Sequence, residues 1–514
     1  MEFLGVPDSL YLNMVKKLLI LIFISSSLII KSQTLSEILS ISFEKPIGTA
    51  RFESMGGAFG ALGGDISSIN INPASGAVFI DNEFGFTMST ESIKNSTLFF
   101  NNNEVTNNFK FSINQGGGIW LLKNYGEGNI NQISFGINTQ TVNSFNDNFD
   151  SKGRNTINSI DSFFLNNSLG FSANDLSVDS NESISSVYKY LGEYYGYAAQ
   201  QAFLGYQSYI LSFDDDSKSF YSQADISEGV NQHYINESKG ANTKSNLNLS
   251  IQYKENYYFG LNINFHEVYK SNFTRHVESN FSELSPIKNI TFENSLVTQG
   301  KGFSIQIGTI ARFNSFRLGL SYQTPTWYSL WDETYQSIDT KSEDVDGNVY
   351  QDKIDPKVTN VYPEYKITSP SIITASTAFI FGEIGLISLD IISQDYSKIK
   401  LKPTRDFSFS NNEINTKLAN SLDLRLGTEF RFKNFSIRGG YQSFGSPYKD
   451  SEIMEDYNTF SFGFGYDFGD TVLSVSNKIS ESKRKHQLFD SGLTDLTKID
   501  SNTSSSTLSL IFKF

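Results

Sequence analysis

Few residues in this chain of 514 residues could carry out chemistry. It contains four histidines and no cysteine. A haem receptor needs an axial ligand, and a hydrolase needs a histidine beside a nucleophile, but no nucleophile is marked by its spacing from His233, His266, His276 or His486. The lack of cysteine excludes disulfides and thiolate metal or redox sites. We therefore predict that the protein is not an enzyme and uses no metal or cofactor.

Two further motifs have the outline of ligand sites but lack their essential parts. The glycine repeat from Gly57 through Gly60 to Gly63 could be mistaken for a phosphate loop, yet no buried strand precedes it and no Lys-Ser/Thr pair follows. The stretch 342–347 is acidic like a calcium loop. However, Ser342 occupies the first ligand position, and Lys353 stands where a bidentate glutamate is needed. We interpret this stretch as an acidic turn.

The N-terminus has the pattern of a secretory signal peptide. Lys16 and Lys17 precede an apolar run over residues 18–30, and the small residue Ser32 follows. The run is too short for a membrane anchor, which needs about 20 residues. We expect residues 1–32 to be removed after export, with Met14 as an alternative start. No cysteine follows the run, so a lipoprotein anchor is excluded.

Charge and composition narrow the class of protein. The net charge of −14 argues against nucleic acid as a partner. After the N-terminus, no stretch reaches the ~18 apolar residues of a spanning helix, although 14% of the residues are aromatic and glycine occurs 38 times. An exported protein of this composition is typical of an all-β transmembrane barrel rather than a helical bundle.

The C-terminus alternates as a strand with one apolar face. Leu508, Leu510, Phe512 and Phe514 lie on one side of the pleat, and polar residues lie on the other. Bacterial outer-membrane barrels end in this way, although a soluble β-sandwich could as well. We predict that Phe512 and Phe514 are a signal for the barrel-assembly machinery.

Strand patterns recur in pairs joined by short turns. The predicted hairpins are 247–253 with 257–265, 303–307 with 316–322, and 422–432 with 435–441. Charged residues alternate with the apolar ones in the last pair, and we place them inside a water-filled barrel: Asp423, Arg425, Glu429, Arg431 and Arg438. Long polar stretches at about 140–245 and 330–365 predict partly helical extracellular loops. The first contains a helical pattern over 183–211. We interpret this helix either as packing for the loops or as a surface on which a ligand first binds.

The segment before the first strand differs from the rest, because it is rich in glycine and has no strand alternation. It includes Gly56, Gly57, Gly63 and Gly64, and then the tripeptide Asn72-Pro73-Ala74. Glycine permits tight bends, proline fixes φ, and asparagine bonds to nearby backbone, so we predict a compact segment in a confined space with a rigid peg at the tripeptide. An ordinary Asx-Pro turn is the alternative for the tripeptide.

These motifs resemble the start of mature FadL/TodX-type channels, which carry long-chain fatty acids and other hydrophobic compounds across outer membranes. Later motifs resemble the form of this family common in Bacteroidetes: Thr324-Pro325-Thr326-Trp327-Tyr328, Ser369-Pro370, Asp395-Tyr396, Arg438-Gly439-Gly440-Tyr441 and Ser446-Pro447-Tyr448. The resemblance implies a barrel of about 14 antiparallel strands over residues 81–514. It also implies an N-terminal hatch over residues 33–80, which includes Asn72, Pro73 and Ala74.

The expected function is therefore uptake of long-chain fatty acids or other hydrophobic small molecules through a barrel of the bacterial outer membrane, with release sideways past the hatch. Outer-membrane lipid and lipopolysaccharide are the expected surroundings. Two alternatives remain: a structural or interaction barrel whose acidic loops contact other surface molecules, and a general porin.

A glycine triplet is the candidate for the lateral exit. Alternation at Phe109, Phe111 and Ile113 is interrupted before Ile119 by Gly116, Gly117 and Gly118. Consecutive glycines leave a strand without side-chain cover and favour a kink. The resemblance implies an opening in about the third strand, so we predict an exit here, with a simple barrel bend or turn as the alternative.

Overall fold

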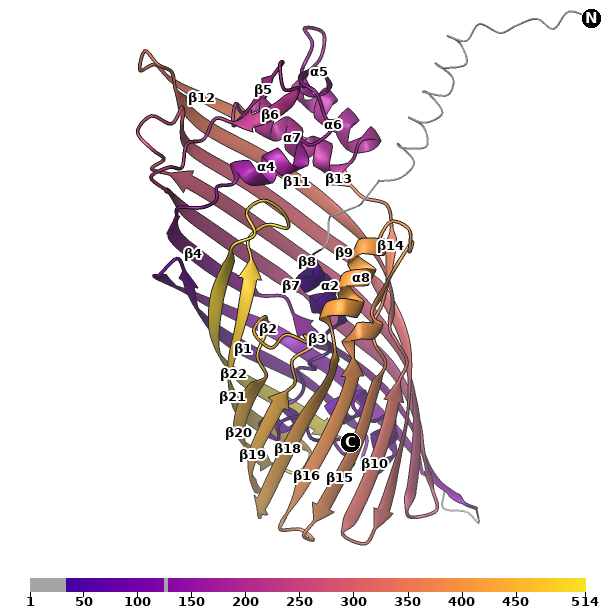
Figure 1. Ribbon diagram of the computed structural model, residues 1–514. Helices are drawn as coiled ribbons and strands as arrows, with labels where there is room; N and C mark the ends of the chain where they lie inside the picture. The colour runs from indigo at the N-terminus through magenta and orange to yellow at the C-terminus, as the bar shows by residue number, and fades with distance from the viewer. Residues whose placement is uncertain (1–33, 124–127) are drawn as a thin grey trace, which may run out of the picture.

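The computed structural model describes residues 34–123 and 128–514, and the predicted signal peptide lies outside them. The fold is a closed barrel of 14 antiparallel strands (Figure 1). In hydrogen-bonded order the strands are β1 (Glu83–Phe99), β2 (Asn102–Lys123), β3 (Ile130–Ser144), β7 (Val230–Tyr253), β8 (Tyr257–Ser279), β9 (Ile287–Phe313), β10 (Phe316–Gln323), β15 (Ile372–Ile380), β16 (Gly385–Asp395), β18 (Asn420–Phe432), β19 (Phe435–Phe444), β20 (Tyr457–Asp467), β21 (Thr471–Gln487) and β22 (Leu496–Lys513). Pairing of β22 with β1 closes the ring.

The three predicted hairpins are confirmed. Strand β7 returns as β8 with Tyr253 paired to Tyr257, β9 returns as β10 with Phe313 paired to Phe316, and β18 returns as β19 with Phe432 paired to Phe435. All three short turns lie at one end of the barrel, which we name the turn end. The opposite end, where the long connections lie, is named the loop end.

At the loop end the sheet continues beyond the ring. Strand β4 (Asp147–Asn155) pairs with β7, and β11 (Trp327–Glu343) pairs with β9. The remaining extensions are β12 (Val349–Ile354), β13 (Asn360–Val361), β14 (Tyr365–Thr368) and β17 (Lys400–Lys402). The predicted loop at about 330–365 is therefore largely strand, whereas the one at about 140–245 contains strands and helices in similar amounts. Their polar residues join ladders on β7, β9 and β11 because neighbouring long strands offer hydrogen-bond partners past the apolar band.

Helices collect on the loop end. They are α4 (Asp161–Asn167), α5 (Ala173–Leu176), α6 (Ile184–Tyr194) and α7 (Tyr197–Gln207), beside the hairpin of β5 (Leu211–Asp214) and β6 (Ser219–Ser222) (Figure 1). Helix α8 (Ser408–Lys417) and the short η3 (Tyr396–Lys398) lie on the other side of the mouth. The predicted helix at 183–211 is two helices, because Gly196 breaks it at a φ of 83°. Tyr188, Leu191 and Phe203 are buried and pack this helical layer together.

The outer surface of the barrel carries a continuous apolar band. On β8, for example, Phe259, Leu261, Ile263 and Phe265 are all exposed. A water-soluble protein does not expose so large an apolar surface, whereas lipid covers it without penalty. None of the helices among the described residues is long and apolar enough to cross a membrane.

Strand β22 has the predicted orientation. Leu508, Leu510 and Phe512 follow one face, and Phe512 is exposed, whereas Ser509 is buried and its hydroxyl hydrogen-bonds with Thr87 Oγ1 over 2.7 Å. Phe514 lies just past the strand, with its backbone N–H donating to the carbonyl of Asn82. Its side chain is exposed at the turn end.

An inner segment, residues 34–82, precedes β1 and occupies the barrel interior. It contains α2 (Leu35–Ser42), α3 (Ala50–Ser54), η1 (Ile66–Asn70) and η2 (Pro73–Val78). Side chains cap each of these short elements: Thr34 and Glu37 form a capping box on α2, Thr49 caps α3, Asp65 caps η1 and Asn72 caps η2. The caps supply acceptors for N–H groups that would otherwise lack partners in so short a helix.

The C-terminal face generates a prediction about assembly. Replacing Phe514 with Asp should lower the amount of folded barrel in the membrane several-fold, because an apolar end of the last strand becomes charged. Heat-modifiable mobility in gels measures the folded fraction. Phe468→Asp is the matched control, since Phe468 is 65% exposed and Phe514 is 66% exposed. Equal losses in both variants would indicate a general effect of the apolar band rather than a terminal signal.

Candidate functional site

The barrel wall has a gap between β2 and β3. The two strands pair only from Gln115 opposite Gln140 to Lys123 opposite Gln132. Beyond Gln115, β2 remains paired with β1 as far as Asn102, and β3 remains paired with β7. A register shift lies near the point of separation in each neighbouring ladder. The β1–β2 ladder shifts between Thr87 and Met88, and the β3–β7 ladder shifts between Thr141 and Asn143. A local bend at bulges therefore opens the ladder.

The gap is bounded at its loop end by side-chain contacts. The Thr106 hydroxyl accepts from the backbone N–H of Asp150 over 3.1 Å, and Asn102 Nδ2 donates to the carbonyl of Lys152 over 3.1 Å. An ion pair of 3.6 Å joins Lys152 to Glu104. The wall gap therefore lies between residues 107–114 of β2 and residues 141–146, which follow the part of β3 that pairs with β2.

The wall gap lies within the apolar band. Phe109, Phe111 and Ile113 point outward along its β2 border and are 70%, 59% and 72% exposed. Ile137, the outward residue of β3 just below the gap, is also exposed. A molecule leaving the barrel here would meet lipid.

The predicted exit glycines lie in the ladder beside the gap, not in the gap itself. Gly116, Gly117 and Gly118 each pair with both β1 and β3. A Cβ on Gly117 would come within 2.6 Å of the Ile137 carbonyl oxygen, so the glycine lets β2 and β3 approach closely. A large residue at Gly117 would therefore disturb the ladder before it filled the gap.

The inner segment covers the gap from within. The N–H of Lys45 donates to the Val142 carbonyl over 2.6 Å, and the N–H of Ile47 donates to the Thr141 carbonyl over 2.9 Å. Residues 45–47 therefore pair with the edge of β3 where β2 has left it. A small cavity of about 30 Å³ remains between Ile47 and the wall.

Charged contacts hold the inner segment on either side of this edge. Glu44 accepts from Lys244 Nζ at 3.1 Å and from Gln323 Nε2 at 2.7 Å, and Glu53 accepts from Lys478 Nζ at 2.6 Å. These contacts fix residues 45–47 from above and below. Sequence spacing could not have paired residues so far apart.

The Lys45 side chain lies among aromatic rings. Its Nζ is 4.7 Å from the ring centre of Phe43, 5.3 Å from that of Phe444 and 4.5 Å from that of Tyr457. Cation–π attraction favours this placement of a desolvated ammonium. Burial lowers the pKa of Lys45 to about 8, although Asp423 acts in the opposite direction.

The predicted peg contacts the opposite wall. Asn72 Nδ2 donates to the carbonyls of Gly60 at 2.7 Å and Thr309 at 3.0 Å, while Asn72 Oδ1 accepts from the N–H of Ala74. The Pro73 carbonyl accepts from Asn248. Gly260 of the wall lies next to the peg. A Cβ there would come within 2.2 Å of the Pro73 carbonyl carbon, so a larger residue would prevent this close contact.

The four predicted hatch glycines have left-handed backbone. The φ values are 59° at Gly56, 67° at Gly57, 68° at Gly63 and 64° at Gly64, a region that other residues rarely adopt. Two of them also allow close approach to the wall or to the segment itself: a Cβ on Gly56 would be 2.9 Å from the Tyr441 carbonyl oxygen, and one on Gly63 would be 2.7 Å from Val78 Cβ.

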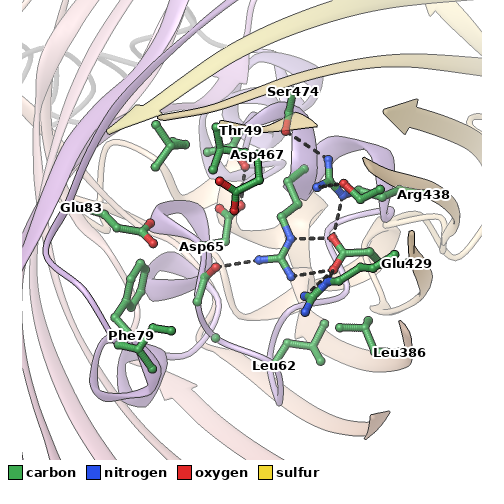
Figure 2. Close-up of a pocket in the computed structure, with 18 of the residues that line it drawn as sticks. Thr49, Leu62, Asp65, Phe79, Glu83, Leu386, Glu429, Arg438, Asp467 and Ser474 are labelled. Atoms are coloured by element: carbon green, nitrogen blue, oxygen red, sulfur yellow. Dashed lines mark hydrogen bonds and ion pairs between the residues drawn. The ribbon is translucent and has the colours of Figure 1, made fainter. Parts of the chain in front are cut away.

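A cavity of about 480 Å³ separates the inner segment from the turn end (Figure 2). Glu429 is one of the residues that line it and binds three guanidinium groups, those of Arg51 at 2.8 Å, Arg438 at 2.7 Å and Arg431 at 2.6 Å. Arg51 comes from the inner segment and the others from the wall. The prediction that this charged face points inward is confirmed, and one of its charges, Glu429, binds Arg51 of the inner segment.

An apolar cluster lies on the loop side of the lumen, next to buried polar groups such as Asn242 and His266. Ile38, Leu39 and Ile41 of α2 pack into one buried cluster with wall and loop residues, among them Tyr328, Leu330, Tyr365, Phe407, Ile414 and Leu418. Phe43 connects this lumen cluster to the aromatic rings around Lys45. It packs against the cluster and makes an edge-on contact with Tyr396, with the ring centres 5.1 Å apart. An apolar molecule would find favourable contacts along this side of the inner segment.

Comparison with known proteins identifies the fold. No family model matches the chain, and no curated protein matches it. The structure is similar to that of a Pseudomonas aeruginosa FadL homologue, with a TM-score of 0.53 and 11% identity, covering 92% of this chain and 100% of that one. The P. putida toluene transporter TodX gives a TM-score of 0.49 and 11% identity, covering 91% and 98%. The resemblance seen in the motifs is thus confirmed at the level of the fold.

The peg contacts generate a prediction about stability. Asn72→Ala removes three hydrogen bonds from a buried side chain, and it should destabilise the packed inner segment by about 1–3 kcal/mol per polar group left without a partner. Limited proteolysis should then cut residues 34–82 faster while heat-modifiable barrel persists. Asn107→Ala, at an exposed wall position, is the control. Equal protease resistance in both variants would show that the peg does not hold the segment.

Proposed function

We propose that this protein is an outer-membrane channel that takes up hydrophobic small molecules, long-chain fatty acids among them, and releases them sideways into the membrane. The observation that carries the proposal is the wall gap in the apolar band, covered from inside by residues 45–47. A lateral opening with a displaceable cover would let a ligand that partitions into lipid leave the barrel directly into the membrane.

The energetics favour a lateral route for such a ligand. Burying an acyl chain gains roughly 0.8 kcal/mol per CH₂, so release into water would cost that amount for each group. The lumen cluster offers apolar contacts on the loop side, and Phe109, Phe111 and Ile113 offer them outside the gap. A ligand could pass from one to the other without entering bulk water.

The inner segment would act as the hatch. Its two backbone hydrogen bonds to β3 satisfy an otherwise open strand edge. Opening them costs about 1–3 kcal/mol for each carbonyl left without a partner. Displacing residues 45–47 is therefore within reach of ligand binding energy. The segment below them is held more firmly, by Arg51 on Glu429 and by the peg.

The rival functions predict different behaviour. A general porin needs an open polar lumen, whereas the described inner segment fills the lumen with buried residues such as Phe52, Met55 and Phe59. In planar bilayers the purified protein should show little steady conductance. Large stable openings would favour the porin. A purely structural barrel would bind no hydrophobic compound, and binding of lipopolysaccharide or other surface proteins would then be its role.

A disulfide across the gap tests the hatch. The natural chain has no cysteine, so Ile47→Cys with Thr141→Cys introduces a single pair at a backbone hydrogen bond. Oxidation should lower uptake of a labelled fatty acid at least about tenfold, because residues 45–47 cannot leave β3, and reductant should restore it.

Each single-cysteine variant serves as the control for this pair, and gel mobility without reductant verifies the cross-link. Undiminished uptake through a fully cross-linked barrel would exclude the wall gap as the exit. Lack of uptake in the wild-type protein for every hydrophobic compound tested would instead overturn the transport function itself.

A further inference from the structure

The outer face of the barrel is recessed near the closure of the ring. A groove of about 490 Å³ lies on the lipid side of β20, β21, β22, β1 and β2, and carbon atoms make up most of its surface. The strand register explains the recess, because outward residues of neighbouring strands form rows across the wall. One row consists of Phe462, Asn477, Ser506, Thr90 and Phe111. The next row towards the loop end consists of Phe460, Ile479, Ser504, Ser92 and Phe109.

Both rows begin and end with phenylalanine. The rings on β20 form one ridge, with Phe460 64% and Phe462 52% exposed, and Phe109 and Phe111 form the other ridge on β2. Between the ridges, β22 and β1 carry only hydroxyl side chains in these rows. We name this recess the lipid-face groove. A serine gains less from contact with lipid than a leucine, so these positions favour a recess over membrane contact.

A cation lies at the loop-side mouth of the lipid-face groove. The row above the hydroxyl residues is wholly polar, and it consists of Asn458, Glu481, Asn502, Lys94 and Asn107. Lys94 is exposed, and no carboxylate among the described residues lies within 4.0 Å of its ammonium. Glu481 belongs to the same row but lies two strands away. Lys94 therefore presents a free positive charge where the apolar band ends.

The lipid-face groove has the depth of one lipid leaflet. Met88 lines its turn-side end, and β1 runs about 20 Å from there to Lys94 at ~3.3 Å per residue. Strands of membrane barrels tilt by about 45°, so this distance corresponds to a depth of about 14 Å, close to half of the ~30 Å hydrocarbon core. A lipid with its head beside Lys94 could extend an acyl chain to the end of the groove.

We propose that the lipid-face groove binds lipopolysaccharide, with an acyl chain between the phenylalanine ridges and a phosphate of the lipid head on Lys94. The long connections of such barrels face the outside of the cell, and this phosphorylated glycolipid fills the leaflet on that side. A second barrel fits less well, because its convex wall would contact the ridges without filling the recess. The site requires only an outer-membrane barrel and is independent of transport through the wall gap.

The bound lipid would lie next to the wall gap. Phe109 and Phe111 form one ridge of the groove and also the β2 border of the gap. An acyl chain in the groove would therefore pack against one side of this ridge, while the gap opens on its other side.

Lipid retained by the purified full chain tests the acyl part of the site. The protein is extracted in mild detergent, and quantitative mass spectrometry measures lipopolysaccharide per barrel. Thr90→Leu with Ser506→Leu fills the floor of the groove and should lower the retained lipopolysaccharide at least about tenfold. Heat-modifiable barrel should persist, because leucine is favoured on a lipid face. Thr309→Leu is the control, since Thr309 lies between Phe259 and Leu320 in the apolar band of another wall region.

A charge variant tests the head of the lipid separately. Lys94→Gln should lower the retained lipopolysaccharide about fivefold, because a lysine near the membrane surface attracts an anionic head. Lys239→Gln, at an exposed lysine of β7, should leave it unchanged.

Four outcomes would overturn the inference. The first is wild-type protein that retains no lipopolysaccharide, and the second is equal retention in the wild type and the floor variant. The third is a phospholipid or fatty acid that is lost in its place when the floor is filled. The last is a dimer in light scattering that the floor variant turns into a monomer, which would assign the groove to a second copy. None of them bears on uptake, which the Ile47 and Thr141 cross-link tests independently.

Discussion

The closed ladder of backbone hydrogen bonds in the barrel wall is the constraint on which the rest of the structure depends. In hydrocarbon an unpaired N–H or C=O costs several kcal/mol, so a spanning sheet must close on itself. This barrel closes through β22 and β1 but lets β2 leave β3 above Gln115. The edge that results is paired instead with the backbone of residues 45–47. The inner segment is thereby part of the wall as well as its filling.

Polar side chains in the lumen serve the same arrangement. An open channel would keep its charges solvated, but here Glu429 binds Arg51, Lys478 binds Glu53 and Lys244 binds Glu44, so that three wall strands hold one inner segment. The peg at Asn72 fixes its far side. These contacts are strong at the turn end and weaker at residues 45–47.

Much of the fold could be predicted because it follows from local alternation. The hairpins at 253–257, 313–316 and 432–435 and the outward face of Leu508, Leu510 and Phe512 need only a period of two and a turn residue. The sequence of β2 also contains an indication of the wall gap, on either side of the glycine triplet. Outward residues are odd-numbered at Phe109, Phe111 and Ile113 but even-numbered at Trp120 and Leu122, a change of phase that requires a bulge near Asn114.

The sequence alone determined the all-β class and the inward charged face, because each depends on residue type or on neighbours in the chain. The tertiary structure decided which strand edge is open, that residues 45–47 cover it and that Glu429 binds the guanidinium groups of Arg51 and Arg438. Those facts depend on which distant residues meet across a closed ring. No local pattern encodes a contact between Lys45 and Val142, because the register of the whole barrel brings them together.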